Sequence, residues 1–98
     1  MSDRDAADFR KLDELMQKDE ILFRVGIGHL LSVGYANLTD EAVEKTIEEI
    51  EAEALSEEAE LQVISPAYQV AILRMALKIR EVPLWTLLKF ISRKVRIS

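Results

Sequence analysis

The chain has 98 residues and no cysteine; 49% of its residues are hydrophobic, 32% are charged, and the formal net charge is −5 at pH 7. This composition excludes an intrinsically disordered chain and any disulfide or thiol chemistry, and the length predicts one domain over residues 1–98. Glycine occurs three times and proline twice, so few breaks interrupt the chain and we expect long helices.

The first predicted helix begins near the N-terminus, where Ser2 or Asp3 can cap it. Its apolar residues are three and four positions apart, which places them on one helix face: Phe9, Leu12, Leu15 and Met16. The sequence leaves open whether residues 1–20 pack on their own subunit, extend from it or exchange with a second subunit.

The glycines that follow are expected to interrupt this pattern. The helical spacing continues to Phe23, and we expect Gly26 and Gly28 to loosen it before a shorter helix over 27–33. Gly34 can end that helix because glycine tolerates a positive φ. The same glycines do not form a dinucleotide-binding loop, since no strand precedes them and the third glycine of that motif is missing.

A second long helix is predicted to begin after Thr39, which can accept hydrogen bonds from the first free N–H groups. Leu38 and Val43 have the spacing of a hydrophobic staple across this helix start. The narrow apolar stripe of this helix is Val43, Ile47, Ile50, Ala54 and Leu61.

Glutamates cover most of the rest of this acidic helix. They could form a solvated face, bind a divalent cation, or contact the basic residues of the C-terminal helices within an assembly. A helical two-metal site needs Glu-x-x-His pairs, and the only histidine, His29, is elsewhere. We therefore expect no metal, no cofactor and no catalytic residue.

Two further helices are predicted after Ser65, which can cap a helix that has Pro66 at its first position. This helix, over 66–81, is apolar around most of its circumference and should be enclosed on several sides. Pro83 is then expected to occupy the first position of the last helix. Trp85 and Phe90 flank the core face of this helix. The expected core residues of the last helix are Leu84, Leu87, Leu88, Ile91 and Val95.

The C-terminal 31 residues combine apolar and basic character. Residues 68–98 contain 18 apolar residues and a net charge of +6, whereas residues 1–67 have a net charge of −11. A small chain cannot easily bury so many apolar side chains alone, so we expect an all-α bundle of four to five helices that forms an intertwined homodimer. The candidate residues for the dimer or partner interface are Ile72, Met75, Ile79, Leu84, Trp85, Leu87, Leu88, Lys89, Phe90, Ile91 and Arg93.

Two other interpretations of the C-terminal helices are weaker. A helix-turn-helix would use residues 84–96 as recognition helix, but its first residues, Leu84 and Trp85, are apolar where base contacts need polar groups. A basic amphipathic helix could also lie on a membrane surface. Acids occupy the start of the chain where a signal peptide has bases, and no apolar run approaches the roughly 20 residues of a spanning helix. We expect a cytoplasmic protein without a membrane or direct nucleic-acid partner.

Three parts of the chain carry a resemblance to a known family. They are Phe23-Arg24 with Ile27-Gly28 and Gly34, then Thr46-Ile47-Glu48-Glu49-Ile50, and finally Leu84-Trp85-Thr86-Leu87-Leu88 through Lys94-Val95-Arg96-Ile97-Ser98. Over residues 23–98 the chain resembles the TraM antiactivators of conjugative rhizobial and agrobacterial plasmids.

The resemblance implies a function that composition and spacing do not supply. It implies a non-enzymatic homodimer that binds TraR, the LuxR-type transcription activator of quorum sensing. Binding would stop the activator from holding its promoter DNA and so repress conjugal plasmid transfer, with no small-molecule ligand involved. A small DNA-binding regulator and a helical adaptor or chaperone remain the alternatives.

Overall fold

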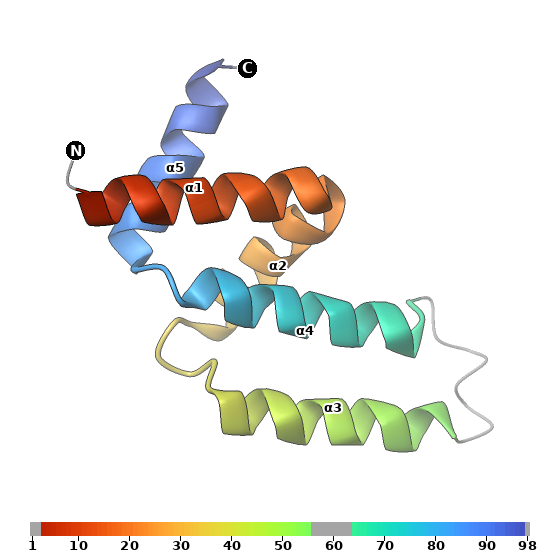
Figure 1. Ribbon diagram of the computed structural model, residues 1–98. Helices are drawn as coiled ribbons and strands as arrows, with labels where there is room; N and C mark the ends of the chain where they lie inside the picture. The colour runs from red at the N-terminus through yellow and green to blue at the C-terminus, as the bar shows by residue number, and fades with distance from the viewer. Residues whose placement is uncertain (1–2, 56–63, 98) are drawn as a thin grey trace.

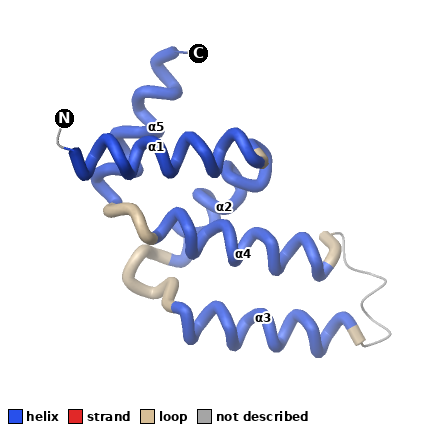
Figure 2. The backbone as a smooth tube through the Cα atoms, viewed as in Figure 1, coloured by secondary structure: helices blue, strands red, loops and turns tan. Residues whose placement is uncertain are grey.

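The structure is a computed structural model in which residues 3–55 and 64–97 are described, the last three of them by their backbone alone. These residues form α-helices joined by short loops, without a strand among them (Figures 1 and 2). The helices are α1 (Asp3–Lys18), α2 (Glu20–Val33), α3 (Asp40–Ala54), α4 (Pro66–Arg80) and α5 (Leu84–Ile97). The predicted all-α bundle of four to five helices is confirmed. Leu61, predicted to extend the α3 stripe, lies outside the described residues.

The helix is interrupted between α1 and α2 at Asp19, several residues before the glycines that were expected to interrupt it. Asp19 has an extended backbone, and its carboxylate accepts a hydrogen bond from the Leu22 N–H at 2.9 Å. The predicted short helix over 27–33 is therefore wrong at its start, because α2 runs unbroken through Gly26 and Gly28. Its predicted end at Gly34, which has a φ of 102°, is confirmed.

The predicted starts of α3 and α4 are confirmed by their hydrogen bonds. Thr39 accepts from the Ala42 N–H at 3.1 Å, and Ser65 accepts from the Tyr68 N–H at 3.2 Å. Helix α5 begins at Leu84, one residue later than predicted. Pro83 precedes the helix, and its carbonyl accepts the first helical bond from the Leu87 N–H at 3.0 Å.

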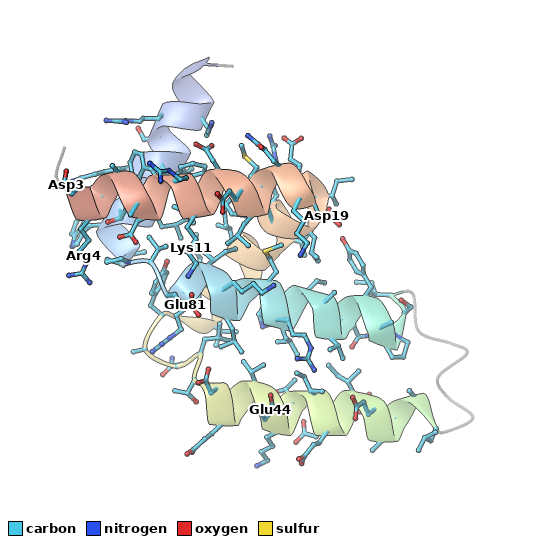
Figure 3. The ribbon with its side chains drawn as sticks, viewed as in Figure 1. Asp3, Arg4, Lys11, Asp19, Glu44 and Glu81 are labelled. Atoms are coloured by element: carbon cyan, nitrogen blue, oxygen red, sulfur yellow. The ribbon has the colours of Figure 1, made fainter. Side chains whose placement is uncertain are left out.

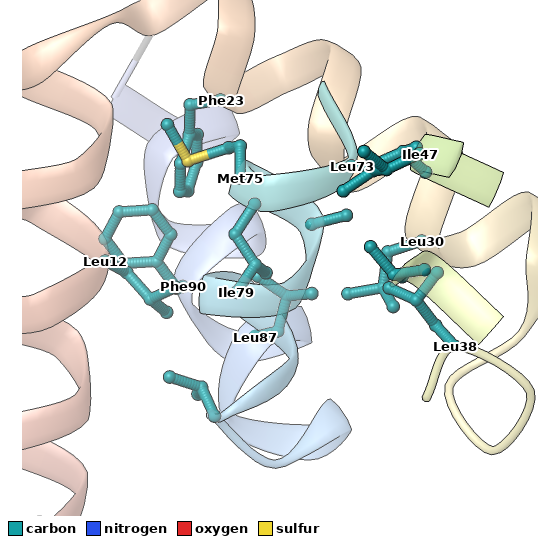
Figure 4. Packing of buried hydrophobic residues seen from close by; sticks show 13 residues of the cluster. Leu12, Phe23, Leu30, Leu38, Ile47, Leu73, Met75, Ile79, Leu87 and Phe90 are labelled. Atoms are coloured by element: carbon teal, nitrogen blue, oxygen red, sulfur yellow. The ribbon is translucent and has the colours of Figure 1, made fainter. Parts of the chain in front are cut away.

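The arrangement of the helices places α4 at the centre. Helix α4 packs against both α2 and α3, while α1 packs against α2 and crosses α5 (Figure 1). The enclosed α4 predicted from its apolar circumference is thereby confirmed. The molecule is elongated, with principal extents of 51 × 29 × 19 Å. Leu12, Phe23, Leu30, Ile79 and Leu87 are almost completely buried in the core (Figure 4).

Helix α5 buries a different face from the one predicted. Leu87 is fully buried as expected, but Leu84 and Leu88 are exposed, and Thr86 and Phe90 are buried instead. The cause is α1, which approaches α5 on the side of Phe90. The aromatic ring of Phe90 meets those of Phe9 and Phe23 edge to face, with centroids 5.9 Å and 6.0 Å apart. The side chain of Val95, also predicted as core, lies outside the described side chains.

Candidate protein-binding surface

The residues predicted for an interface fall into two groups in the structure. One group is covered by the chain itself: Ile72, Met75, Ile79, Leu87 and Phe90. The other group is exposed or half-buried on α5: Leu84, Trp85, Leu88, Lys89, Ile91 and Arg93. Only the second group offers surface to another molecule in this conformation.

The first turns of α5 carry an exposed apolar patch. Trp85 is 75% exposed, and Leu84 and Leu88 beside it are 37% and 39% exposed. These residues are within one turn of each other, while Leu87 and Phe90 hold the opposite side of the helix in the core. Neighbouring exposed apolar side chains on one helix face mark a candidate surface for contact with another protein.

The second half of α5 contacts α1 through the basic side chains of Arg93 and Lys94. The Arg93 guanidinium lies 4.8 Å from the ring centroid of Phe9, and the Lys94 ammonium lies 5.3 Å from that of Phe90. Lys94 Nζ also lies 2.9 Å from a carboxylate oxygen of Asp13. These contacts place the Arg93 and Lys94 side chains beside α1.

A second link joins α1 to the loop before α5. Lys11 of α1 donates a hydrogen bond to the carboxylate of Glu81, and Figure 3 shows the two side chains pointing toward each other. Such exposed pairs contribute only about 0–1 kcal/mol each. They therefore set the register of α1 on the C-terminal helices rather than most of the stability.

A groove between α2 and α5 was missed by the sequence analysis. Its open cavity of about 290 Å³ has an apolar floor and one cation on each wall, Arg24 from α2 and Lys94 from α5. The lining residues are Met16, Phe23, Arg24, Ile27, Phe90, Ile91 and Lys94. They come from the consecutive helices α1 and α2 and from α5, which lies far along the chain, so no local pattern could have revealed the groove.

A second cavity lies between α2, α3 and α4 and contains the single histidine. Its lining is His29, Thr46, Ile50, Gln69, Ile72 and Leu73, and its volume is about 300 Å³. His29 is half-buried and is the only ionisable side chain among these residues. One titratable group without a second beside it does not make an acid–base pair.

The acidic face of α3 points away from α4. The described glutamates of this helix, including the labelled Glu44, are exposed (Figure 3). Within the described ranges, no three His, Cys, Asp or Glu side chains come together as a metal site would require. The expected contact of this face with basic residues in an assembly remains a prediction.

Among the residues that the structure describes, Tyr35, in the loop after α2, has a strongly shifted pKa. Burial raises the pKa of its hydroxyl to about 12, and the positive charge of Arg80 acts in the opposite direction. The hydroxyl oxygen is buried without a hydrogen-bond partner. The Tyr35 carbonyl, in contrast, accepts a hydrogen bond from Nε of Arg80 at 2.8 Å, which joins the end of α2 to the end of α4.

Two searches of the described structure and the sequence gave negative results. No helix in the described part of the chain is long and apolar enough to cross a membrane. Comparison with known protein families, with curated proteins and with solved structures finds no match to this chain.

Proposed function

We propose that this protein is a non-enzymatic antiactivator of quorum sensing that acts in the cytoplasm as a homodimer. It binds a LuxR-type transcription activator, resembling TraR, prevents the activator from binding DNA, and so represses conjugal plasmid transfer. The observation that supports binding to a protein is the exposed patch of Leu84, Trp85 and Leu88 on α5. The choice of a LuxR-type target comes from the resemblance to the TraM family.

The physical mechanism is a shift in the population of activator conformations. The inhibitor need only bind the form of the activator that cannot hold DNA more tightly than the form that can. Each tenfold preference shifts the equilibrium by about 1.4 kcal/mol. Trp85 is the strongest anchor candidate, because tryptophan is enriched among residues whose truncation costs the most binding energy.

A mobility-shift titration tests this proposal with three components: a LuxR-type activator, its promoter DNA and this protein. We expect increasing protein to remove the activator–DNA band in a saturable way. Trp85→Ala should weaken this inhibition at least tenfold, because a typical hot spot contributes about 2 kcal/mol or more. Lys45→Ala, which removes an exposed side chain of α3, is the control and should inhibit like the natural chain.

The same titration, together with a co-purification from the native host, separates the two alternatives. If the protein alone shifts DNA with a steep salt dependence, the basic side chains of α5 act directly on DNA and the antiactivator is wrong. If the activator remains bound to DNA at saturating inhibitor, and an unrelated helical protein co-purifies instead, the adaptor class is favoured.

A further inference from the structure

The side of α2 that points away from α4 is exposed. Its central residues are four, three and four positions apart, so they form one stripe along the helix. This stripe, called the α2 stripe below, consists of Ile21, Val25, Gly28 and Ser32. All of its residues are exposed, whereas Phe23, Gly26 and Leu30 on the opposite side of the helix are buried.

The two halves of the α2 stripe differ in size. The N-terminal half carries two branched apolar side chains, of which Ile21 is 70% and Val25 is 40% exposed. The C-terminal half carries only a hydrogen atom at Gly28 and a small hydroxymethyl group at Ser32. A Cβ atom at Gly28 would meet no described atom within 4 Å, so the space above this glycine is open. The stripe is therefore raised in its first half and hollow in its second half.

A second copy of the chain fits this relief when two α2 helices pack antiparallel across a two-fold axis. The axis would cross the stripe midway between Val25 and Gly28, so the large half of each copy would lie on the small half of the other. Val25 would then lie over Gly28 of the partner subunit, and Ile21 would lie over Ser32 of the partner subunit. Large side chains placed against small ones fill the space between two packed helices.

The charges of the molecule also favour a second copy at this surface. The α2 stripe has no ionisable side chain, and the acid and the base of α2, Glu20 and Arg24, pair with each other at 2.9 Å. Two copies can therefore face each other here without net repulsion. A symmetric contact through the exposed face of α3 would place glutamates against glutamates, and one through the second half of α5 would place bases against bases.

We propose that the α2 stripe is the surface through which two copies of this chain form an antiparallel homodimer, with Val25 of each copy over Gly28 of the partner subunit. This inference rests on the proposed function in so far as that function requires a homodimer. It adds the surface that is used and the orientation of the two copies. It also gives a reason for a glycine at an exposed position within α2, and it assigns the dimer and the activator to different helices.

An exchange of the two central residues tests this packing by sedimentation equilibrium of the full-length chain. Gly28→Val should raise the dissociation constant of the dimer about tenfold or more, because the new side chain would overlap Val25 of the partner subunit. The variant should keep its helical content, since its own chain leaves room for the side chain. Adding Val25→Gly to this variant exchanges the raised and hollow positions and should restore the dissociation constant to within about threefold of the natural value.

Controls separate a loss of the dimer from a loss of the fold. Ala52→Val enlarges an exposed small residue of α3 and should dimerise like the natural chain. Circular dichroism of each variant measures its helical content. If Val25→Gly lowers that content, Val25→Ala replaces it in the exchange, because alanine has the higher helix propensity. The proposal is wrong if Gly28→Val dimerises like the natural chain, or if a folded exchange variant dimerises as weakly as Gly28→Val.

Disulfide formation tests the orientation of the two helices, because the chain has no cysteine of its own. In the antiparallel contact, Ile21 lies over Ser32 of the partner subunit but about 16 Å along the helix from Ile21 of the partner subunit, at 1.5 Å per residue. A disulfide requires Cα atoms within about 7 Å of each other. A mixture of Ile21→Cys and Ser32→Cys chains should therefore cross-link on oxidation, whereas either variant alone should not. Cross-linking of Ile21→Cys with itself, or none in the mixture, would contradict the antiparallel contact.

The result is distinguishable from that of the proposed function. If the chain dimerises through the α2 stripe but leaves a LuxR-type activator on its DNA, the stripe stands and the antiactivator falls. If Gly28→Val stays dimeric and the natural chain removes the activator from DNA, the antiactivator stands and the stripe falls. A natural chain that is monomeric throughout the micromolar range would overturn this inference whatever the activator assay shows.

Discussion

Gly26 and Gly28 lie two residues apart in α2, yet only one of them touches another helix. A Cβ atom at Gly26 would lie 2.9 Å from Cγ of Met75 on α4, whereas a Cβ at Gly28 would meet no described atom within 4 Å. The first glycine therefore allows α2 and α4 to approach closely. The second has no such role, although each glycine weakens a helix by about 1 kcal/mol relative to alanine.

The two alanine substitutions should consequently have opposite effects. Gly28→Ala should raise the free energy of unfolding by about 0.5–1 kcal/mol, through the better helix propensity of alanine. Gly26→Ala should lower it by about 1 kcal/mol, because overpacking costs about 1–3 kcal/mol and exceeds the same gain. Urea unfolding followed by circular dichroism measures both, and an equal rise in the two variants would contradict the close contact.

Tyr35 makes stability depend on pH in the alkaline range. The pKa of its hydroxyl is about 12 in the folded chain and about 10 when unfolded, because burial disfavours the ionised form. The unfolded chain therefore loses this proton first as pH rises. The contribution of Tyr35 is constant below pH 10 and is lost progressively as pH rises from 10 toward 12.

Tyr35→Phe should remove this part of the pH dependence. At pH 7 the variant should be as stable as the natural chain or up to about 1 kcal/mol more stable, because it no longer buries an unpaired hydroxyl. Between pH 10 and 12 its unfolding free energy should fall less steeply. Thermal melts at several pH values measure the difference, and parallel curves for the two proteins would show that the hydroxyl is solvated.

The first two turns of α5 have one buried side and one exposed side. Its inner side is held by Phe90, which is 3% exposed and contacts the rings of Phe9 and Phe23. Its outer side carries Trp85 and Lys89. Phe90 therefore links α5 to both α1 and α2.

Truncation of that residue should loosen α5. Phe90→Ala should lower the free energy of unfolding by about 3–5 kcal/mol, the usual cost of deleting a buried aromatic ring. Lys89→Ala, one residue earlier and exposed, should change it by no more than about 0.5 kcal/mol. Denaturant unfolding gives both values, and a small effect at Phe90 would mean that α5 is not packed on α1 in solution.

The whole molecule leaves several large apolar residues uncovered on two helices. Besides the patch on α5, Ile21 and Val25 of α2 are 70% and 40% exposed. An elongated chain with this much exposed apolar surface gains free energy when a second copy covers part of it. The homodimer expected from the sequence remains a prediction that this surface supports.

Light scattering at micromolar concentration should therefore give about twice the mass of one chain. Ile21→Ala should shift the equilibrium toward the monomer, since it shortens an apolar side chain of α2 that is 70% exposed, while the helical content stays the same. Lys45→Ala should remain dimeric. A natural chain that stays monomeric at this concentration would contradict both the dimer and the reasoning from apolar content.

The features that the sequence determined by itself are local. Thr39, Ser65 and Gly34 mark helix ends because each acts through hydrogen bonds or backbone angles within a few residues of itself. The all-α class follows in the same way from apolar spacing along single segments. These predictions required no knowledge of which helices meet.

The tertiary structure decided which side of each helix is buried. Helix α5 has more apolar residues than one neighbour can cover, so the direction from which α1 arrives selects Phe90 for the core and leaves Leu84 and Leu88 outside. The groove likewise exists only because α1, α2 and α5 meet. Contacts between distant segments depend on the packing of whole helices, and apolar spacing within one helix does not show which other helices will cover it.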